Sequence, residues 1–384
     1  MLPWSAELAG RLDHHVVDST LLRGNPLGDP HERPLMVYVP PGYEDSAAGR
    51  IYPTIYVLQG YTGHIGMWWN RAPFRQPFPE LADALFAQGD VPPAIVVFVD
   101  AWTSLGGSQF LDSPATGRYH SYLRDEIVPW VDARYRTVAD RDHRAVTGKS
   151  SGGYGAMVTA MLAPDVFGAL ATHAGDALFE VSARPAFPSL ARRLRDMYEG
   201  SYEKFLTDFR GRLAGTRDGD LELLEMYAYA AAYSADEDGT VRLPFDATGV
   251  AVPEVWARWL AKDPVVMAGQ PLYAEALRSM RAIWVDSGDR DEYFLDFGAT
   301  AFRDAVRAAG GVRRPGAVRA LPRRARGDRV PLPARAGLAL RTPGRTRQGL
   351  TGRTNRSRTD RGAAQAVQEA GQCGRAVGQV AGVL

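Results

Sequence analysis

The chain has 384 residues but a single cysteine, Cys373, which excludes an internal disulfide and a cysteine-ligated metal site. It has no run of eighteen apolar residues, which excludes a membrane-spanning helix, and its first residues lack the basic start and apolar core of a secretory signal. Neither a phosphate-binding glycine loop nor a metal-ligand spacing of histidine and carboxylate is present. These absences predict a cytoplasmic protein that uses no cofactor or metal and acts on no membrane.

Aromatic residues and lysine are missing from the last part of the chain. From Val312 to Leu384 there are sixteen arginines and three acidic residues, but no Lys, Phe, Trp, Tyr, Ile or Met. Such a segment buries too little apolar surface to offset its conformational entropy. A basic arm for nucleic acid, a disordered linker and a message read out of frame from near Val312 all fit this composition. We favour the third and expect no nucleic-acid partner, because a nucleic-acid arm mixes lysine with arginine.

A serine-rich turn carries the strongest local signal for chemistry. A short β-prone run leads into the turn Gly-Lys-Ser-Ser-Gly-Gly-Tyr-Gly, which starts at Gly148 and precedes an apolar helical stretch. A serine on such a turn exposes its hydroxyl, and glycine two residues to either side lets strand and helix approach closely. Gly148 and Gly152 flank Ser150 in this way, whereas Ser151 has Lys149 at one of these positions. The pattern predicts Ser150 as a nucleophile; the alternative is a glycine-rich turn whose serines only cap the helix.

A second glycine-rich turn follows the buried-strand run at residues 52–58. It reads Gln-Gly-Tyr-Thr-Gly-His and places Tyr61 just beyond the strand end. Backbone N–H groups in such a turn stabilise negative charge on a carbonyl oxygen. The amides of Tyr61 and Ser151 are therefore candidate donors of an oxyanion hole, although the turn alone also fits an ordinary β-to-α connection.

With these motifs the chain, from about Gly24 to Gly311, resembles the "putative esterase" branch of the α/β-hydrolases. That group includes esterase D (S-formylglutathione hydrolase), feruloyl esterase domains, enterochelin esterase and the mycolyltransferases. The matching stretches are residues 24–30, 39–43, 58–63, 112–117, the serine turn, 172–176 and the acidic segment 285–292. The resemblance implies a carboxylesterase-type serine hydrolase that forms an acyl-enzyme, with thioester hydrolysis and acyl transfer as close alternatives.

The resemblance also implies a triad acid and a triad histidine. The acid falls on Asp291, in the loop beyond the strand Ala282–Val285, where open α/β sheets place their sites. Asp286 and Asp289 are its competitors; the first is too close to the strand and the second fits a solvated turn.

The triad histidine should follow the acid in the chain, but none does. All seven histidines lie upstream, so His173 is the best remaining surrogate base, and a catalytically impaired hydrolase-fold protein is the second function class. The histidines are His14, His15, His31, His64, His120, His143 and His173.

The alternation of strand and helix patterns predicts an α/β fold, with a mainly parallel central sheet and helices on both faces. The expected strands are Pro34–Val39, Thr54–Leu58, Ala94–Val99, His143–Thr147, Ala169–His173 and Ala282–Val285. The expected helices are Tyr119–Arg134 and Phe294–Ala309, and residues 187–280 form a helical cap insertion, unless these helices simply pack on the sheet.

We expect one hydrolase domain at residues 1–311, with the tail 312–384 outside the fold. The break near Val312 falls where the resembled family has its last strand, its histidine loop and its last helix. The strand Ala282–Val285 should then present an unpaired edge that favours aggregation. The expected binding partner is a small-molecule ester, and the sequence is also compatible with a homo-oligomer.

Four side chains are candidates for substrate binding. His173 and Asp176 follow a strand at the same edge as Ser150, and Trp102 and Tyr154 are aromatic residues near the expected mouth. Most aromatic residues in any fold lie in the core, so core packing is the competing interpretation of Trp102 and Tyr154.

Overall fold

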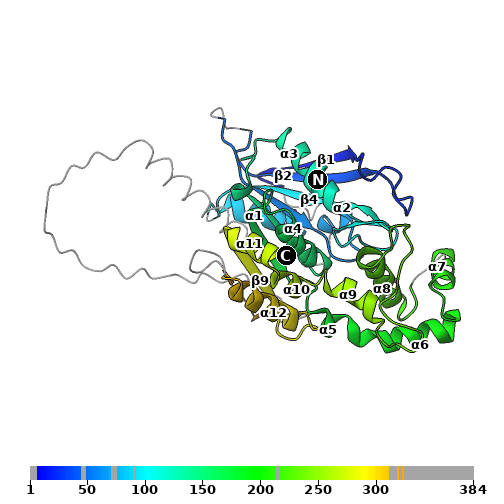
Figure 1. Cartoon of the computed structure of the whole chain (residues 1–384). Coiled ribbons are helices and arrows are strands. Elements are labelled where there is room, and N and C mark those ends of the chain that lie inside the picture. Colours follow the sequence, from blue (N-terminus) through cyan, green and yellow to red (C-terminus); the bar gives the residue numbers. More distant parts are fainter. Residues whose placement is uncertain are drawn as a thin grey trace, which may run out of the picture.

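The computed structural model describes residues 7–44, 49–70, 76–89, 91–212 and 216–310, together with the backbone of 318–319 and 322–323. Its centre is one sheet in the order β1-β2-β4-β3-β7-β8-β9-β10, with β11 also beside β9 (Figure 1). The strands are β1 Arg11–Asp18, β2 Glu32–Val39, β3 Thr54–Leu58, β4 Ile95–Val99, β7 Arg144–Lys149, β8 Ala169–His173, β9 Ala282–Gly288, β10 Val318–Arg319 and β11 Pro322–Arg323. β2 pairs antiparallel with β1 and with β4, and all other pairings in this sheet are parallel.

The predicted mainly parallel sheet is confirmed. β3 and β8 have the predicted bounds, and the other predicted strands are shifted or extended by at most three residues at an end. β1 was not predicted; all its side chains except the buried Val17 are exposed or half-buried, so it lacks the apolar run of the central strands. A short hairpin of β5 (Asp112–Ser113) and β6 (Gly117–Arg118) lies outside the main sheet.

Both faces of the sheet are buried. In β3, Tyr56 and Leu58 belong to one apolar cluster, and Ile55 and Val57 belong to another. The helix α4 (Ser151–Leu162) covers the first face and α1 (Phe78–Ala87) covers the second. This double burial explains the near-continuous apolar runs of the central strands.

The helix predicted over Tyr119–Arg134 is present as one helical run with a π-helical middle. It comprises α2 (Tyr119–Ser121), the π-helix η2 (Tyr122–Ile127) and α3 (Val128–Asp132). The second predicted helix is α12 (Leu295–Ala308), close to its expected bounds. Short 3-10 turns are η1 (Ile65–Trp68) and η3 (Arg141–His143).

The segment between β8 and β9 is helical, as predicted. Its elements are α5 Phe179–Ser182, η4 Arg184–Ala186, α6 Phe187–Tyr198, α7 Tyr202–Gly211, α8 Asp220–Tyr233, α9 Pro253–Leu260, α10 Pro264–Ala268 and α11 Pro271–Ser279. α10 and α11 pack on α4 beside the sheet, whereas α6 and α7 pack on each other at the far end of the molecule (Figure 1). α10 and α11 thus belong to the body of the fold. That α6 and α7 form part of a cap remains a prediction.

The expectation of an unpaired edge at β9 is wrong. Val318 pairs in parallel with Ile283, and Pro322 pairs with Ser287. Backbone pairing at a sheet edge needs no aromatic or large apolar side chain, so composition did not exclude it. The rest of the tail, including Cys373, lies outside the described residues, and its disorder or shifted frame stays a prediction.

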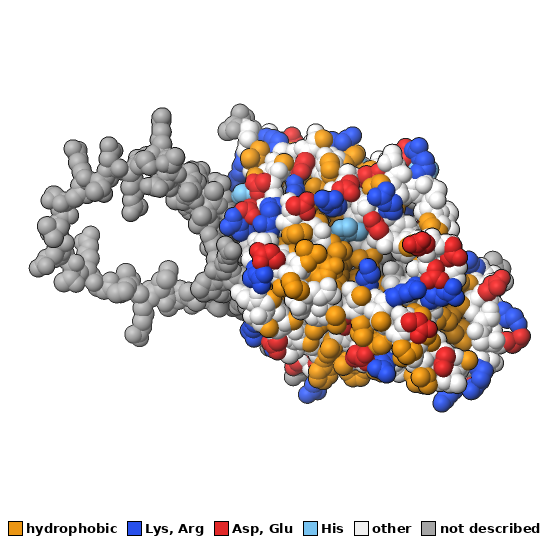
Figure 2. All heavy atoms as spheres, viewed as in Figure 1, with side chains coloured by type: hydrophobic (Ala, Val, Ile, Leu, Met, Phe, Trp, Pro, Cys, Tyr) orange, Lys and Arg blue, Asp and Glu red, His pale blue; other side chains and the backbone are white. Residues whose placement is uncertain are grey.

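The surface in Figure 2 mixes acidic and basic side chains instead of separating them by sign. Among the helices that the structure describes, none is long and apolar enough to cross a membrane.

Candidate active site

Ser150 occupies a strained turn between β7 and α4. Its backbone angles are φ 55° and ψ −126°, in a region that non-glycine residues rarely adopt. The Ser150 N–H donates to the carbonyl oxygen of His173 at 3.0 Å, and its own carbonyl accepts from the Tyr154 N–H at 2.9 Å. These two bonds hold the strained residue between the end of β8 and the first turn of α4.

The glycines on either side of Ser150 sit where no side chain fits. A Cβ at Gly148 would lie 2.4 Å from the carbonyl carbon of Gly152, and a Cβ at Gly152 would lie 2.2 Å from the carbonyl oxygen of Leu58. Lys149, which would flank a nucleophile at Ser151, is exposed. The close approach of strand and helix that we expected around Ser150 is therefore present.

The loop after β3 reaches this turn. A Cβ at Gly60 would lie 3.2 Å from the carbonyl oxygen of Lys149 and 3.5 Å from the Cβ of Ser150. The next residue, Tyr61, is anchored by its hydroxyl, which donates to the carbonyl oxygen of Leu105 at 2.9 Å. Ser151 is the first residue of α4, so its N–H has no acceptor within the helix. The two candidate oxyanion donors thus lie on the two segments that meet at Ser150.

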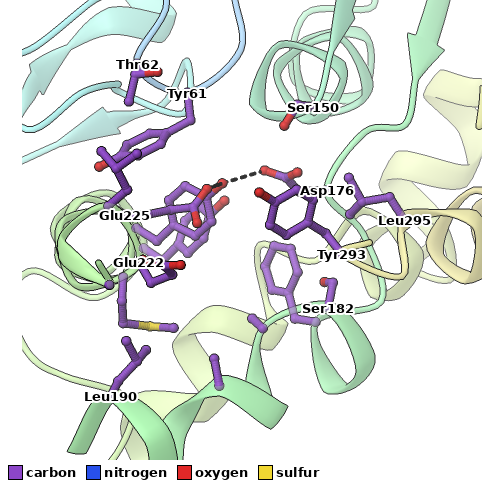
Figure 3. A pocket seen from close by; sticks show the side chains of 18 of the residues that line it. Tyr61, Thr62, Ser150, Asp176, Ser182, Leu190, Glu222, Glu225, Tyr293 and Leu295 are labelled. Atoms are coloured by element: carbon purple, nitrogen blue, oxygen red, sulfur yellow. Dashed lines mark hydrogen bonds between the residues drawn. The ribbon is translucent and has the colours of Figure 1, made fainter. Parts of the chain in front are cut away.

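A cavity of about 630 Å³ opens beside Ser150. Figure 3 shows Tyr61, Asp176 and Glu225 around the same space as Ser150, with Tyr293 and Leu295 at its side. The lining residues come from the loops after β3, β7, β8 and β9, from the start of α12 and from the helical segment: Tyr61, Thr62, Ser150, Asp176, Phe179, Ser182, Ala183, Ala186, Leu190, Thr216, Arg217, Asp218, Gly219, Leu221, Glu222, Glu225, Met226, Tyr229, Tyr233, Trp259, Tyr293 and Leu295.

Two carboxyl groups in this cavity have raised pKa values. Asp176 is buried, and its Oδ2 accepts from Ser151 Oγ at 3.1 Å and from the Tyr229 hydroxyl at 2.9 Å. Burial raises the pKa of Asp176 to about 6, although its hydrogen bonds act in the opposite direction. Burial, and then the charge of Asp176, raise the pKa of Glu225 to about 7. Both groups titrate near neutral pH.

Of the four predicted substrate contacts, the structure places only Asp176 in the cavity. Tyr154 is buried, stacks on Phe179 with ring centroids 6.1 Å apart, and donates to the carbonyl oxygen of Lys262 at 3.1 Å. The carbonyl oxygen of Trp102 accepts from the Arg33 guanidinium at 2.6 Å, and Trp102 does not line the cavity. Tyr154 is therefore a core-packing residue, which was the alternative to a role in substrate binding.

His173 is also absent from the cavity lining. Its Nδ1 lies 2.7 Å from Asp286 Oδ1, and both side chains are buried. Among the described residues, no hydrogen bond joins the His173 ring to Ser150, so the structure does not support His173 as a surrogate base.

Sequence reasoning expected a helical segment over the site but named none of the α8 residues that line it. Glu222, Glu225, Met226, Tyr229 and Tyr233 all line the cavity. Met226 directly follows Glu225, and the other steps are three or four residues, which places the five side chains on one face of a helix. That periodicity was visible in the sequence, but the same pattern is typical of a helix face that packs on a core.

Asp291 lies in the loop between β9 and α12. Its Oδ1 accepts from the N–H groups of Tyr293 at 2.9 Å and Leu295 at 3.3 Å. Its charge contributes to the raised pKa of Asp176, and its two partners line the cavity. The competitor Asp286 belongs to β9 and is buried against His173.

In the part of the chain that the structure describes, no histidine is hydrogen-bonded to Asp291 or Ser150. Within the same ranges, no group of three or more His, Cys, Asp or Glu side chains is arranged to hold a metal ion. The described site therefore contains a serine, candidate oxyanion donors and a carboxylate, but no triad histidine.

Sequence comparison finds two kinds of relative. The chain is 28% identical over 134 residues to an endo-1,4-beta-xylanase/feruloyl esterase of Xylanibacter ruminicola, a match that covers 34% of this chain and 18% of that protein. It is 31% identical over 145 residues to an esterase of Mycobacterium tuberculosis, covering 37% of this chain and 28% of the relative. The matched regions are thus a minor part of both relatives.

Structural comparison finds a ferulic acid esterase with a TM-score of 0.50 and 20% sequence identity, covering 83% of this chain and 91% of that one. This likeness shows that the fold is that of an α/β-hydrolase. The sequence model of the esterase family, described as "Putative esterase", matches residues 30–313, which is more than half of the chain. The chain therefore belongs to this esterase family of the α/β-hydrolases.

Proposed function

We propose that the chain is a serine hydrolase that cleaves carboxylic esters through an acyl-enzyme. The observation that carries this proposal is the strained turn at Ser150, with φ 55° and a glycine on either side that admits no side chain. Such a turn exposes the serine hydroxyl at the carboxyl edge of the sheet. Ser150 Oγ attacks the ester carbonyl, and the alcohol leaves when the tetrahedral intermediate collapses.

The reaction also requires that the negative charge developing on the carbonyl oxygen is stabilised. The amides of Tyr61 and Ser151 are the proposed donors, because the loop after β3 contacts the turn at Ser150. A fixed backbone N–H at such a position typically contributes about 3 kcal/mol to transition-state stabilisation.

The Ser150 hydroxyl needs a base that accepts its proton. In α/β-hydrolases this base is a histidine that follows the triad acid in the chain and is oriented by it; the acid here is Asp291. No histidine follows Asp291 in the sequence. This observation favours a second candidate function, a hydrolase-fold protein with impaired catalysis. Loss of one triad member lowers the rate by several orders of magnitude and leaves the contribution of the oxyanion hole.

The acyl group of the substrate is either an aryl group or an aliphatic chain of medium length. Aromatic side chains in the cavity, such as Phe179, Tyr233 and Trp259, fit either one. Thioester hydrolysis and acyl transfer use the same serine chemistry and remain alternatives.

The hydrolysis of p-nitrophenyl acetate and butyrate tests the proposed reaction. We expect the chain to turn over both esters faster than its Ser150→Ala variant, while Ser151→Ala retains part of the activity. Equal rates for the chain and Ser150→Ala would rule out esterase activity at Ser150. If Ser150 still reacts with an active-site probe in that case, the impaired hydrolase is the correct alternative.

A further inference from the structure

The cavity beside Ser150 has an excess of negative charge. Asp176, Asp218, Glu222 and Glu225 line it, and Arg217 is the one cationic residue among the described lining residues. The Arg217 guanidinium lies 3.1 Å from a carboxylate oxygen of Asp208, outside the lining, so part of its charge is already balanced. An anionic substrate would meet repulsion here, because like charges in a poorly solvated site interact strongly.

The hydrogen bonds around the Tyr229 hydroxyl outnumber the protons that the neighbouring hydroxyl groups can donate. The Tyr229 hydroxyl lies 2.9 Å from Asp176 Oδ2, 3.0 Å from Glu225 Oε1 and 2.9 Å from Ser151 Oγ, and Ser151 Oγ lies 3.1 Å from Asp176 Oδ2. Each hydroxyl has one proton to donate. With both carboxyl groups ionised, the two hydroxyl protons serve only two of these four contacts. Asp176 Oδ2 also accepts from Gln109 Nε2 at 3.5 Å, but the two remaining contacts lack a proton unless a carboxyl group is protonated or a cation enters.

Aromatic rings surround the same space. Tyr61 and Tyr229 meet edge to face with ring centroids 5.9 Å apart, and Tyr229 and Tyr233 lie 5.7 Å apart. Phe179, Trp259 and Tyr293 add further rings to the lining. The faces of such rings attract cations, and most strongly where water is excluded.

We propose that the cavity binds an ester whose acyl or alcohol part carries a protonated amine, held between Glu225 and Asp176. This inference rests on the proposed esterase function. Figure 3 shows both carboxylates on the cavity wall, with Ser150 above Asp176, so an ammonium group bound there lies beside the serine that attacks the ester. A neutral sugar hydroxyl donates one hydrogen bond but leaves the charge of both carboxylates uncompensated.

The proposal includes a dependence on pH. Below neutral pH the carboxyl pair holds a proton, which the ammonium group must displace, and above it the pair is ionised. The titratable groups around the pair are Glu222, Tyr229 and Tyr233 on α8, Tyr154 on α4, Tyr61 after β3, and Asp291 after β9. The carboxylates among them add negative charge, and the tyrosines stay neutral. Cation binding should therefore strengthen as the pH rises through 6 and 7.

Three probes of nearly equal shape test the charge preference: benzylamine, benzyl alcohol and benzoate, titrated into the whole chain and followed by ligand-observed NMR. At pH 8 we expect benzylamine to bind at least about tenfold more tightly than benzyl alcohol, the effect of one charge-assisted hydrogen bond. Between pH 5.5 and pH 8 the affinity for benzylamine should rise, while the affinity for benzyl alcohol should stay constant. Equal affinity for both at pH 8, or tighter binding of benzoate, would overturn the proposal.

Variants locate the binding. Glu225→Gln keeps the shape of the side chain and should remove most of the preference for benzylamine. Glu237→Gln makes the same charge change at an exposed position outside the cavity and should leave the preference intact. If both variants or neither lose the preference, the assigned site is wrong. Should Glu225→Gln fail to fold, the pH series of the unaltered chain still decides the question.

These titrations need no turnover, which separates this inference from the proposed function. A chain that prefers benzylamine but has an unreactive Ser150 would contradict only the esterase proposal. A reactive Ser150 without a preference for benzylamine would contradict only the ammonium proposal.

Discussion

Gly152 packs against the carbonyl oxygen of Leu58 so closely that a Cβ at Gly152 would lie 2.2 Å from that oxygen. The contact joins the first turn of α4 to the end of β3. It thereby brings the start of α4, just after Ser150, next to the loop that begins at Gln59. A single glycine thus couples the two segments that form the candidate oxyanion hole.

Replacing Gly152 should show how much of the fold depends on this contact. We expect Gly152→Ala to lower the free energy of unfolding by at least about 2 kcal/mol, because the obstacle is backbone and does not rotate away. Gly211→Ala is the matched control, since no atom of the described residues lies within 4 Å of a Cβ there. Its effect should stay within about 1 kcal/mol and favour stability, because alanine suits a helix better than glycine. Equal urea midpoints for the two variants would contradict the close-packing account.

The hydrogen bond between His173 and Asp286 should contribute to stability and not to chemistry. Asp286→Ala leaves the buried His173 ring without its 2.7 Å partner and the Trp284 indole N–H without its 2.8 Å acceptor, which together should cost about 1–3 kcal/mol in urea denaturation. Asp289→Ala removes an exposed carboxylate from the adjoining loop and should change stability by less than about 0.5 kcal/mol. A stable Asp286→Ala variant that no longer reacts with esters would instead make Asp286 a part of the active site.

Much of the fold could be predicted because the decisive signals are local. The bounds of β3 and β8 were correct, since each is a run of buried residues between polar or glycine-rich turns. The position of Ser150 followed from the steric need for Gly148 and Gly152, which the structure displays as close backbone contacts. These features depend on residues near one another in the sequence.

The rest of the site depends on contacts between distant segments. His173 and Asp286 meet because β8 and β9 pair side by side, which places the two residues opposite each other. Glu225 interacts with Asp176 only because α8 places Tyr229 against both carboxyl groups, although 48 residues separate the two in the chain. No local pattern encodes such a meeting.

The raised pKa of Glu225 should appear as a pH dependence of stability. A carboxyl whose pKa rises on folding, here from 4.5 to about 7, binds its proton more tightly in the folded state. The folded state therefore loses stability as the pH rises from about 4.5 to 7. Glu225→Gln removes this loss, so its free energy of unfolding relative to the unaltered chain should increase over that interval, by roughly 1–3 kcal/mol. A difference that does not vary with pH would contradict the assignment.

The central claim is that Ser150 is the nucleophile, and labelling with a fluorophosphonate tests it most directly. The reagent bonds covalently to an activated serine hydroxyl, and peptide mass spectrometry then locates the adduct. We predict one adduct, on Ser150, absent from Ser150→Ala and retained in Ser151→Ala. An adduct on Ser151, or a chain that acquires none after prolonged incubation, would contradict the account.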